Sequence, residues 1–311
     1  MDLMPRPLVS IIVPSFNQGQ FIRETIDSCL TQGYRPIEVL VMDGGSRDET
    51  VDVLRSFNAP ELRWWSEPDA GVVDAVNKGL RLAKGNILSI QSSDDVFLPD
   101  AISAAVEALT TVIEAGLVYG DIELIDARSA SIGADELGEF DLAAYLGRFQ
   151  YIPQPGACFT RAALNAVGGW REQFSYAADA DFWMRIACRF PVLKLPCRLA
   201  RYRYHDEQRD TQRARIARDW AGAVENLIAS GVLDARQTRY ARMGVHLAKY
   251  RYAPTNDWRQ RTRALYAAVL ANPAGLMHEE FPKRELLPGR QPLWAWLSRV
   301  KRGLGFQPRR G

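Results

Sequence analysis

The sequence is poor in the residues that build zinc sites and disulfide frameworks. Its 311 residues include three histidines and four cysteines, and no two cysteines are spaced as a CxxC pair. The histidines, at positions 205, 246 and 278, are too scattered for a histidine-rich zinc site. Residues 1–16 contain an apolar run that is too short and too β-branched for a secretory leader. We therefore expect a cytoplasmic protein whose thiols are reduced core residues.

Long apolar runs and a strong net charge are also missing. No stretch of 18 apolar residues occurs, so no segment is predicted to span a membrane. The formal net charge of +2 gives no indication of nucleic-acid binding. Apolar residues make up 47% and charged residues 24%, which is ordinary for a folded globular protein. The length allows one large domain with an extension, or two domains.

Strand-like and helix-like segments alternate over about the first 110 residues. Strands are predicted at residues 8–13, 37–42, 62–66 and 87–91. Helices are predicted at residues 20–32, 50–57, 71–83 and 99–109. This alternation is typical of an α/β fold in which helices flank a mostly parallel sheet. Beyond it we expect strands at 118–126, 156–160 and 192–204, a helix at 179–189 and a loop over the site at 133–150.

Polar residues follow each of the first four predicted strands. They lie at residues 15–18, 43–46, 67–69 and 92–95. In parallel sheets ligands bind beyond the carboxyl ends of the strands, so these clusters predict a single site at one edge of the sheet. Asp94 and Asp95 supply carboxylates where Mg²⁺ or Mn²⁺ would neutralise a diphosphate, although the same pair also fits a solvated turn or a helix cap.

Four sequence blocks resemble family 2 glycosyltransferases with a GT-A fold. They are VSIIVPSFNQGQFIRETIDSCLTQ, IEVLVMDGGSRDET, SEPDAGVVDAVNKGL and GNILSIQSSDDVFLPDAI, in matching order and spacing over about residues 7–205. The resemblance implies an enzyme that moves a sugar from a nucleotide-diphosphate sugar to an acceptor hydroxyl and inverts the anomeric carbon. We expect residues 1–205 to form this catalytic domain and residues 206–311 a helical C-terminal extension.

The resemblance implies a nucleotide pocket formed by Pro14, Ser15, Asn17, Asp43, Asp69, Asn77 and Lys78. Asp43 would accept a hydrogen bond from the base, most typically from a uracil imide, so a UDP-sugar is the expected donor. The glycines after Asp43 equally fit a tight turn. Asn77 and Lys78 follow Asp74 by three and four residues and so share a helix face with it, which a solvated helix would also show.

The metal motif departs from the family pattern, because Ser92 stands where an aspartate often begins an Asp-x-Asp motif. The resemblance therefore makes Asp94 the first metal ligand and Asp95 the second, with reduced dependence on Mn²⁺ or Mg²⁺. In relatives a histidine at the position of His205 approaches the metal or the diphosphate. A lone histidine at a strand end is also compatible with a structural role.

The block YAADADFWMRIA, residues 176–187, resembles the acceptor-side Glu-Asp-x-Asp-x-Trp signature. Asp179 matches the catalytic base that takes the proton of the acceptor hydroxyl. Asp181 matches the second aspartate on the donor sugar and acceptor side, which often anchors the helix. Ala178 replaces the first acidic residue, and both aspartates also suit a helix cap. Gln154 and Trp170 are further candidates for sugar contact, and Trp170 equally suits the core.

Residues 206–311 carry no recognisable motif. Residues 281–311 hold eight basic residues and one acidic residue, with Trp294 and Trp296 among them. Aromatic residues beside basic ones suit the boundary of an anionic membrane, and a docked basic tail would look the same. Membrane contact would fit a lipid-linked glycan acceptor at the inner face of a bacterial membrane, as in surface-polysaccharide synthesis.

Three other functions would require or allow different motifs in the sequence. A sugar nucleotidyltransferase needs a glycine-rich loop with a basic residue after the first strand, and PSFNQGQF has neither. A nicotinamide dehydrogenase needs a G-x-G-x-x-G motif there, which is also missing. A non-catalytic relative that binds nucleotide or glycan stays open, because Ser92 and Ala178 depart from the family pattern.

Overall fold

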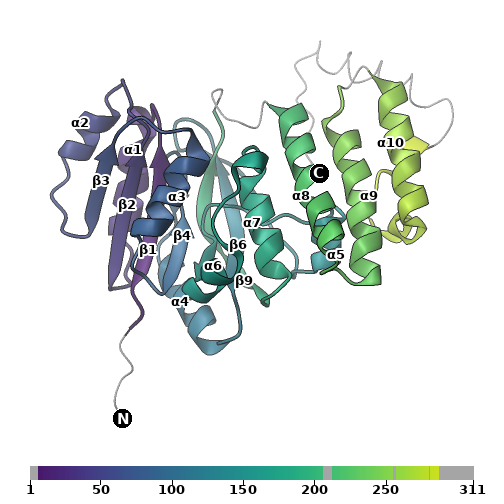
Figure 1. Cartoon of the computed structure of the whole chain (residues 1–311). Helices are drawn as coiled ribbons and strands as arrows, with labels where there is room; N and C mark the ends of the chain where they lie inside the picture. Colours follow the sequence, from purple (N-terminus) through teal and green to yellow (C-terminus); the bar gives the residue numbers. More distant parts are fainter. Residues whose placement is uncertain (1–5, 206–211, 255–256, 280, 287–311) are drawn as a thin grey trace. The chain divides into compact units, whose positions relative to one another are not determined.

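The chain divides into two units in the computed structural model (Figure 1), which describes residues 6–205, 212–254, 257–279 and 281–286. The first unit comprises residues Met1–Phe140 and Tyr151–Arg209, and the second comprises Asp141–Gln150 and Asp210–Gly311. The domain boundary expected near residue 206 falls among residues 206–211, outside the described part of the chain.

In the described residues of the first unit, nine strands form one mixed sheet in the order β3-β2-β1-β4-β8-β6-β9-β5, with β7 paired to β6. The strands are β1 (Val9–Ser15), β2 (Ile37–Asp43), β3 (Leu62–Ser66), β4 (Ile87–Ile90), β5 (Val96–Phe97), β6 (Leu117–Ile125), β7 (Ser131–Asp135), β8 (Cys158–Thr160) and β9 (Val192–Arg203). Strands β1, β2, β3, β4, β6 and β9 run in one direction, and β5, β7 and β8 run against them. The predicted α/β class with a mostly parallel sheet is confirmed.

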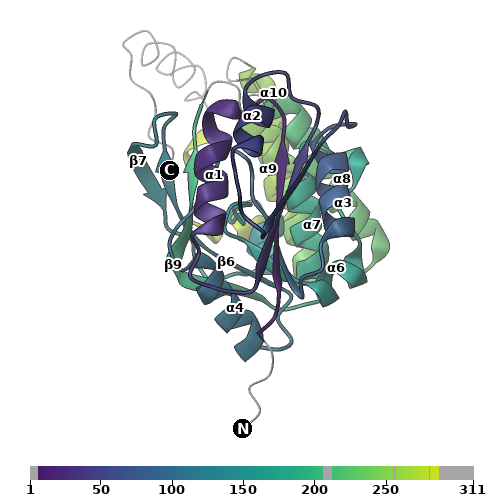
Figure 2. The ribbon, with the colours of Figure 1, turned by 90° about the vertical axis from the view of Figure 1, so that its left-hand side faces the viewer.

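Helices cover both faces of this sheet (Figure 2). They are α1 (Gly19–Leu30), α2 (Thr50–Arg55), α3 (Val72–Leu82), α4 (Ala101–Thr111), α6 (Arg161–Val167) and α7 (Ala178–Ala187). Alternate residues of a strand point to opposite faces. Ile11 accordingly joins the apolar cluster that includes residues of α1 and α4, whereas Ile12 lies against α3. A Cβ on Gly79 of α3 would come within 2.4 Å of Ile12, so this close packing requires glycine.

The prediction of a loop over residues 133–150 is wrong. Residues Ser131–Asp135 form β7, which pairs antiparallel with β6. Residues Leu142–Leu146 form the short helix α5, whose first turn is capped by Asp141 through a hydrogen bond of 2.8 Å from the Ala144 N–H. The pattern was weak because β7 is mostly exposed and α5 is short. The buried residues of α5 contact α9 (Ala235–Tyr252), almost a hundred residues away in the sequence.

The second unit is helical, as expected for the C-terminal region. Its described residues include α5, α8 (Arg213–Ser230), α9, α10 (Trp258–Ala271) and the short 3₁₀ turns Pro273–Met277 and Lys283–Leu286. Phe149, Met243, Leu247 and Leu265 belong to one buried cluster of this unit. Within the described residues, no helix is both long and apolar enough to cross a bilayer. The basic tail with Trp294 and Trp296 lies outside the described residues.

The four cysteines are all described, and none forms a disulfide. Cys29 and Cys158 are buried, and burial raises the pKa of each thiol to about 12. Cys188 is half-buried and Cys197 is exposed. The expectation of core thiols is therefore confirmed for Cys29 and Cys158 and wrong for Cys197, which lies on β9 where its side chain reaches solvent.

Candidate active site

The carboxyl ends of three neighbouring strands lie in register at one edge of the sheet. Ser15 of β1 pairs with Asp43 of β2, which pairs with Ser66 of β3. On the other side of β1, strand β4 runs parallel and leads directly into Ser92. The structure therefore brings the polar residues that follow the first four strands to the same edge.

The Asp43 carboxylate is almost fully buried and carries three hydrogen bonds. Its Oδ2 accepts from the Ser46 N–H at 3.0 Å and from the Ser66 hydroxyl at 2.6 Å. Its Oδ1 accepts from the Ser46 hydroxyl. A carboxylate offers about four acceptor positions, so one position remains on Oδ1. The turn and base-contact interpretations of this residue are thus compatible with each other.

Asn17 joins the loops that follow β1 and β2. Its N–H donates to the Ser46 hydroxyl at 2.7 Å, and its side-chain oxygen accepts from the Arg47 N–H at 2.9 Å. Asn17 has φ 52°, a left-handed conformation that asparagine tolerates better than most residues. Pro14 and Ser15 are buried, and the Ser15 hydroxyl has no hydrogen-bond partner among the described residues.

Asp69 and Lys78 line a small cavity together with Asp43 and Trp65. Oδ2 of Asp69 lies 2.8 Å from the position that a Cβ on Gly44 would take, so this approach requires a glycine after Asp43. The Lys78 ammonium lies 3.1 Å from the Glu67 carboxylate, and this hydrogen bond raises the pKa of Lys78. The cavity thus combines carboxylates with a cation held in place by an ion pair.

Both polar atoms of the Asn77 side-chain amide form hydrogen bonds with the backbone of Trp170. Its Nδ2 donates to the Trp170 carbonyl and its Oδ1 accepts from the Trp170 N–H, each at 2.9 Å. The Trp170 side chain is buried, and its indole N–H has no partner among the described residues. In this structure Asn77 therefore ties α3 to the segment before α7, and its contact with the nucleotide stays a prediction.

The acidic loop holds its two aspartates in different environments. Asp94 Oδ2 lies 3.0 Å from His205 Nε2, and both side chains retain some exposure, 18% for Asp94 and 6% for His205. Asp95 is 1% exposed, and its Oδ1 accepts from the Arg203 N–H at 2.9 Å. Burial raises the pKa of Asp95 well above its usual range, and the neighbouring Asp94 charge raises it further. Asp95 therefore ties the loop to β9, whereas Asp94 stays partly exposed beside His205, whose ring is nearly buried and lines the edge of a neighbouring cavity.

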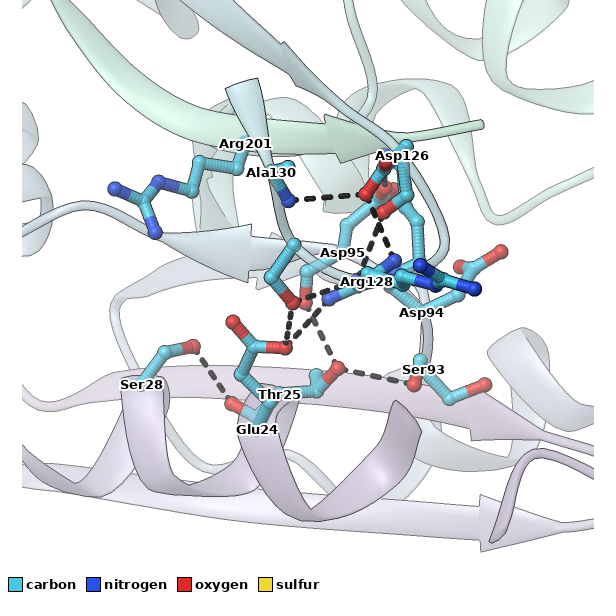
Figure 3. A network of polar contacts seen from close by, with 12 residues as sticks. Glu24, Thr25, Ser28, Ser93, Asp94, Asp95, Asp126, Arg128, Ala130 and Arg201 are labelled. Carbon is cyan, nitrogen blue, oxygen red and sulfur yellow. Dashed lines mark hydrogen bonds and ion pairs between the residues drawn. The ribbon is translucent and has the colours of Figure 1, made fainter. Parts of the chain in front are cut away.

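Arg203 anchors this loop, and sequence reasoning did not identify it. Its buried guanidinium donates through Nε to the Asp94 carbonyl at 2.7 Å and through Nη2 to Glu24 Oε2 at 2.7 Å. Nη1 donates to the Ser129 hydroxyl at 2.9 Å and to the Asp126 carbonyl at 3.2 Å. Figure 3 shows this network, in which α1, the acidic loop and the turn after β6 converge. The sequence RYRYH, residues 201–205, could have indicated this role. Alternate residues of a strand share a face, and Arg203 lies two residues before His205, which was a candidate site residue.

Asp179 and Asp181 both lie in the first turn of α7. Asp179 is half-buried. Asp181 is buried beside Arg185 at 2.8 Å, and burial raises the pKa of its carboxyl group despite this partner. Arg185 in turn donates to the carbonyls of Val167 and Gly169 at 2.6 and 2.7 Å. The structure therefore shows Asp181 anchoring the segment before Trp170, while its contact with sugar stays a prediction.

Gln154 contacts the acidic loop at its start. Its Nε2 donates to the Ser92 hydroxyl and to the Ile90 carbonyl, each at 3.2 Å. Within the described residues, no group of three or more histidine, cysteine, aspartate or glutamate side chains is arranged to hold a metal ion. Asp94 and His205 lie close enough to share an ion, whereas the carboxylate of Asp95 is engaged by the Arg203 N–H, and the roles of all three as metal ligands stay predictions.

Residues 10–183 match the model of glycosyl transferase family 2. The chain belongs to this family. An uncharacterized glycosyltransferase of Mycobacterium tuberculosis is 32% identical over 201 residues, covering 63% of this chain and 75% of the relative. The chondroitin synthase of Escherichia coli is 28% identical over 188 residues, covering 58% of this chain and 26% of the synthase. The predicted glycosyltransferase activity is thereby confirmed.

Solved structures show the same fold. S. aureus TarS in complex with UDP-GlcNAc has a TM-score of 0.64 at 17% identity, covering 96% of this chain and 89% of that chain. A mannosyltransferase from Pyrobaculum calidifontis in complex with GDP-Man and Mn²⁺ has a TM-score of 0.63 at 21% identity, covering 98% and 91%. The chain therefore has the GT-A fold.

Proposed function

We propose that this enzyme transfers a sugar from a UDP-sugar to an acceptor hydroxyl with inversion, assisted by Mn²⁺ or Mg²⁺. The observation that carries the proposal is the pair of Asp94 and His205, 3.0 Å apart at the strand edge that also carries Asp43. Residues 1–205 would carry the chemistry, and residues 206–311 would form an extension.

The side chains present fit a divalent ion. A carboxylate oxygen and an imidazole nitrogen are accepted ligands of divalent metals, and the nitrogen favours Mn²⁺ over Mg²⁺. Two protein ligands leave coordination positions for diphosphate oxygens and water. When bound, the ion would neutralise charge on the diphosphate. Arg203 fixes the Asp94 backbone, so the carboxylate is presented without reorganisation of the loop.

Asp43 supports uracil as the base. Its single remaining acceptor position suits one imide N–H, whereas guanine would present two adjacent donors. In the relatives with solved structures, UDP-GlcNAc is bound by TarS and GDP-Man by the mannosyltransferase, so both bases occur on this fold. Asp43 therefore favours UDP for this chain.

Asp179 is proposed as the base that takes the proton of the acceptor hydroxyl. A positioned carboxylate typically contributes about 10²–10⁴-fold to such a step. The buried pair of Asp181 and Arg185 keeps the first turn of α7 in place, because Arg185 is bound to the preceding loop. Gln154, on Ser92, and the Trp170 segment are proposed to border the sugar.

A lipid-linked glycan is proposed as the acceptor, at the inner face of a membrane. In the second unit, Leu270 of α10 and Met277 are each 83% exposed. Arg259 and Arg263 of α10 are also exposed. Exposed apolar and arginine side chains in the same unit suit the surface of an anionic bilayer. This supports a role in bacterial surface-polysaccharide or glycan synthesis.

The donor and the metal are tested by thermal unfolding with UDP, GDP, TDP or CDP, each with and without Mn²⁺. A ligand at 100 times its Kd adds about 2.7 kcal/mol to the free energy of unfolding. We expect this stabilisation with UDP and Mn²⁺ together, and its metal-dependent part should disappear in Asp94→Asn. Asp179→Asn should keep the stabilisation and lose sugar transfer. A wild-type protein that no nucleotide stabilises under any metal would contradict both the UDP donor and the metal site.

A further inference from the structure

A cavity of about 500 Å³ lies in the first unit beside the Asp94 and His205 pair. Its wall is formed by the start of α1 with Gln20 and Phe21, by the turn at residues 126–128, and by Tyr204 and His205. His205 both lines the cavity and contacts Asp94. A ligand in the cavity would therefore lie next to the two side chains proposed to hold the metal.

The turn after β6 is held in one conformation. Oδ1 of Asp126 accepts from the N–H groups of Arg128 and Ala130, at 2.8 and 3.0 Å. Ser129 has φ 63°, an uncommon conformation for a residue other than glycine. Its hydroxyl donates to Glu24 at 2.7 Å and accepts from Arg203 at 2.9 Å. The contacts to α1 and β9 thus determine where Arg128 sits on the wall (Figure 3).

Two arginines lie near this cavity, and they differ in whether their guanidinium groups have partners. Arg203 is buried, and its donors are directed to Glu24, Ser129 and two carbonyls. Within the described residues, the exposed guanidinium of Arg128 makes no hydrogen bond or ion pair. The hydrogen bond that Arg128 donates to Asp126 comes from its backbone N–H. An arginine with free donors on a cavity wall is suited to two-point binding of a phosphate.

We propose that Arg128 binds a phosphate oxyanion in this cavity, namely the diphosphate of the nucleotide sugar. This rests on the proposed function. In the transfer, the bond between the anomeric carbon and the diphosphate oxygen breaks, and its electron pair leaves with the diphosphate. The acceptor oxygen forms the new bond to the anomeric carbon, and its proton passes to Asp179. Arg128 stabilises the charge that the leaving diphosphate gains.

The position of the cavity favours the donor over a phosphate on the acceptor. Gln20 and Phe21 follow shortly after Asn17, in the segment that leaves β1 beside Asp43. This segment belongs to the nucleotide side of the sheet edge. An acceptor phosphate has the same chemistry, so the experiment has to separate the two sources.

The test measures the Kd of UDP, uridine and inorganic pyrophosphate in saturating Mn²⁺ for wild type, Arg128→Gln and Arg128→Lys. Hydrogen bonds to charged groups predict that Arg128→Gln weakens UDP and pyrophosphate about tenfold or more and leaves uridine unchanged. Arg128→Lys should be intermediate, because lysine keeps the charge without the fork. The matched control is Arg81→Gln, an exposed arginine in the last turn of α3, which should change nothing.

The results separate this proposal from the function on which it rests. Wild-type affinities for UDP and pyrophosphate in a normally folded Arg128→Gln would overturn the proposal. So would Arg128-dependent uptake of inorganic phosphate by the UDP-saturated enzyme, because the anion would then belong to the acceptor. If wild type binds pyrophosphate through Arg128 but binds no UDP, the result supports the anion site at Arg128 and contradicts the proposal of a UDP-sugar donor.

Discussion

Replacing Arg203 by methionine should destabilise the first unit and weaken the proposed metal site together. Methionine keeps much of the length of the side chain and its contact with Phe21, whose ring lies 4.8 Å from the Arg203 guanidinium carbon. What disappears is the set of donors to Asp94, Asp126, Ser129 and Glu24. The perturbation therefore removes hydrogen bonds with little loss of packing.

The magnitude follows from the partners left behind. The carbonyls of Asp94 and Asp126 lose a donor in a part-buried environment, which costs about 1–1.5 kcal/mol each, the lower part of the range for a buried acceptor. The Glu24 side chain is 39% exposed and turns to water, so its ion pair adds about 0–1 kcal/mol. We therefore expect a loss of about 3 kcal/mol in the free energy of unfolding. For a unit of roughly 200 residues this lowers Tm by about 6–12 °C.

The matched control is Arg201→Met on the same strand. Arg201 extends away from the network in Figure 3 and pairs with Glu123 at 2.8 Å with a side chain that is 36% exposed. Its replacement should cost less than about 1 kcal/mol. Urea unfolding gives the free energies, and thermal unfolding with UDP and Mn²⁺ shows whether the metal-dependent stabilisation is lost in Arg203→Met. Equal, small losses in both variants with intact metal dependence would refute the anchoring role of Arg203.

Two further predictions concern pH and membranes. Burial would raise the pKa of Glu38, but hydrogen bonds from Ser10 and the Lys84 N–H, with the nearby Arg63 charge, lower it below its usual 4.5. A carboxyl group whose pKa is lowered by folding stabilises the fold above its unfolded pKa, and this contribution is lost as the pH falls. Between about pH 5 and pH 3, urea unfolding should therefore show a smaller loss of unfolding free energy in Glu38→Gln than in wild type. Equal losses in the two proteins would contradict this prediction. The protein should sediment with anionic vesicles more than with zwitterionic ones, and Leu270→Asp should reduce the difference; equal sedimentation would contradict the membrane proposal.

Much of the first unit was readable from local patterns. The runs at β1 and β2 are continuous and β-branched because both strands are buried on both faces, and such runs are visible without knowledge of the partner strands. Strand β3 was predicted at its observed bounds. The polar residues at the strand ends also followed from the sequence, because parallel strands in alternation with helices place those ends at one edge.

Other features depend on residues that are distant in the sequence. Helix α5 belongs to the second unit through contacts with α9, and no local pattern records such a contact. Asp94 and Asp95 are adjacent and chemically identical, and they differ because β9 buries one of them against the Arg203 N–H and leaves the other beside His205. The sequence therefore sufficed to place carboxylates at this edge of the sheet. Which of them is buried and which stays partly exposed, and which arginine holds the loop, depended on the pairing of segments more than a hundred residues apart, because burial and hydrogen bonding arise from neighbours in space.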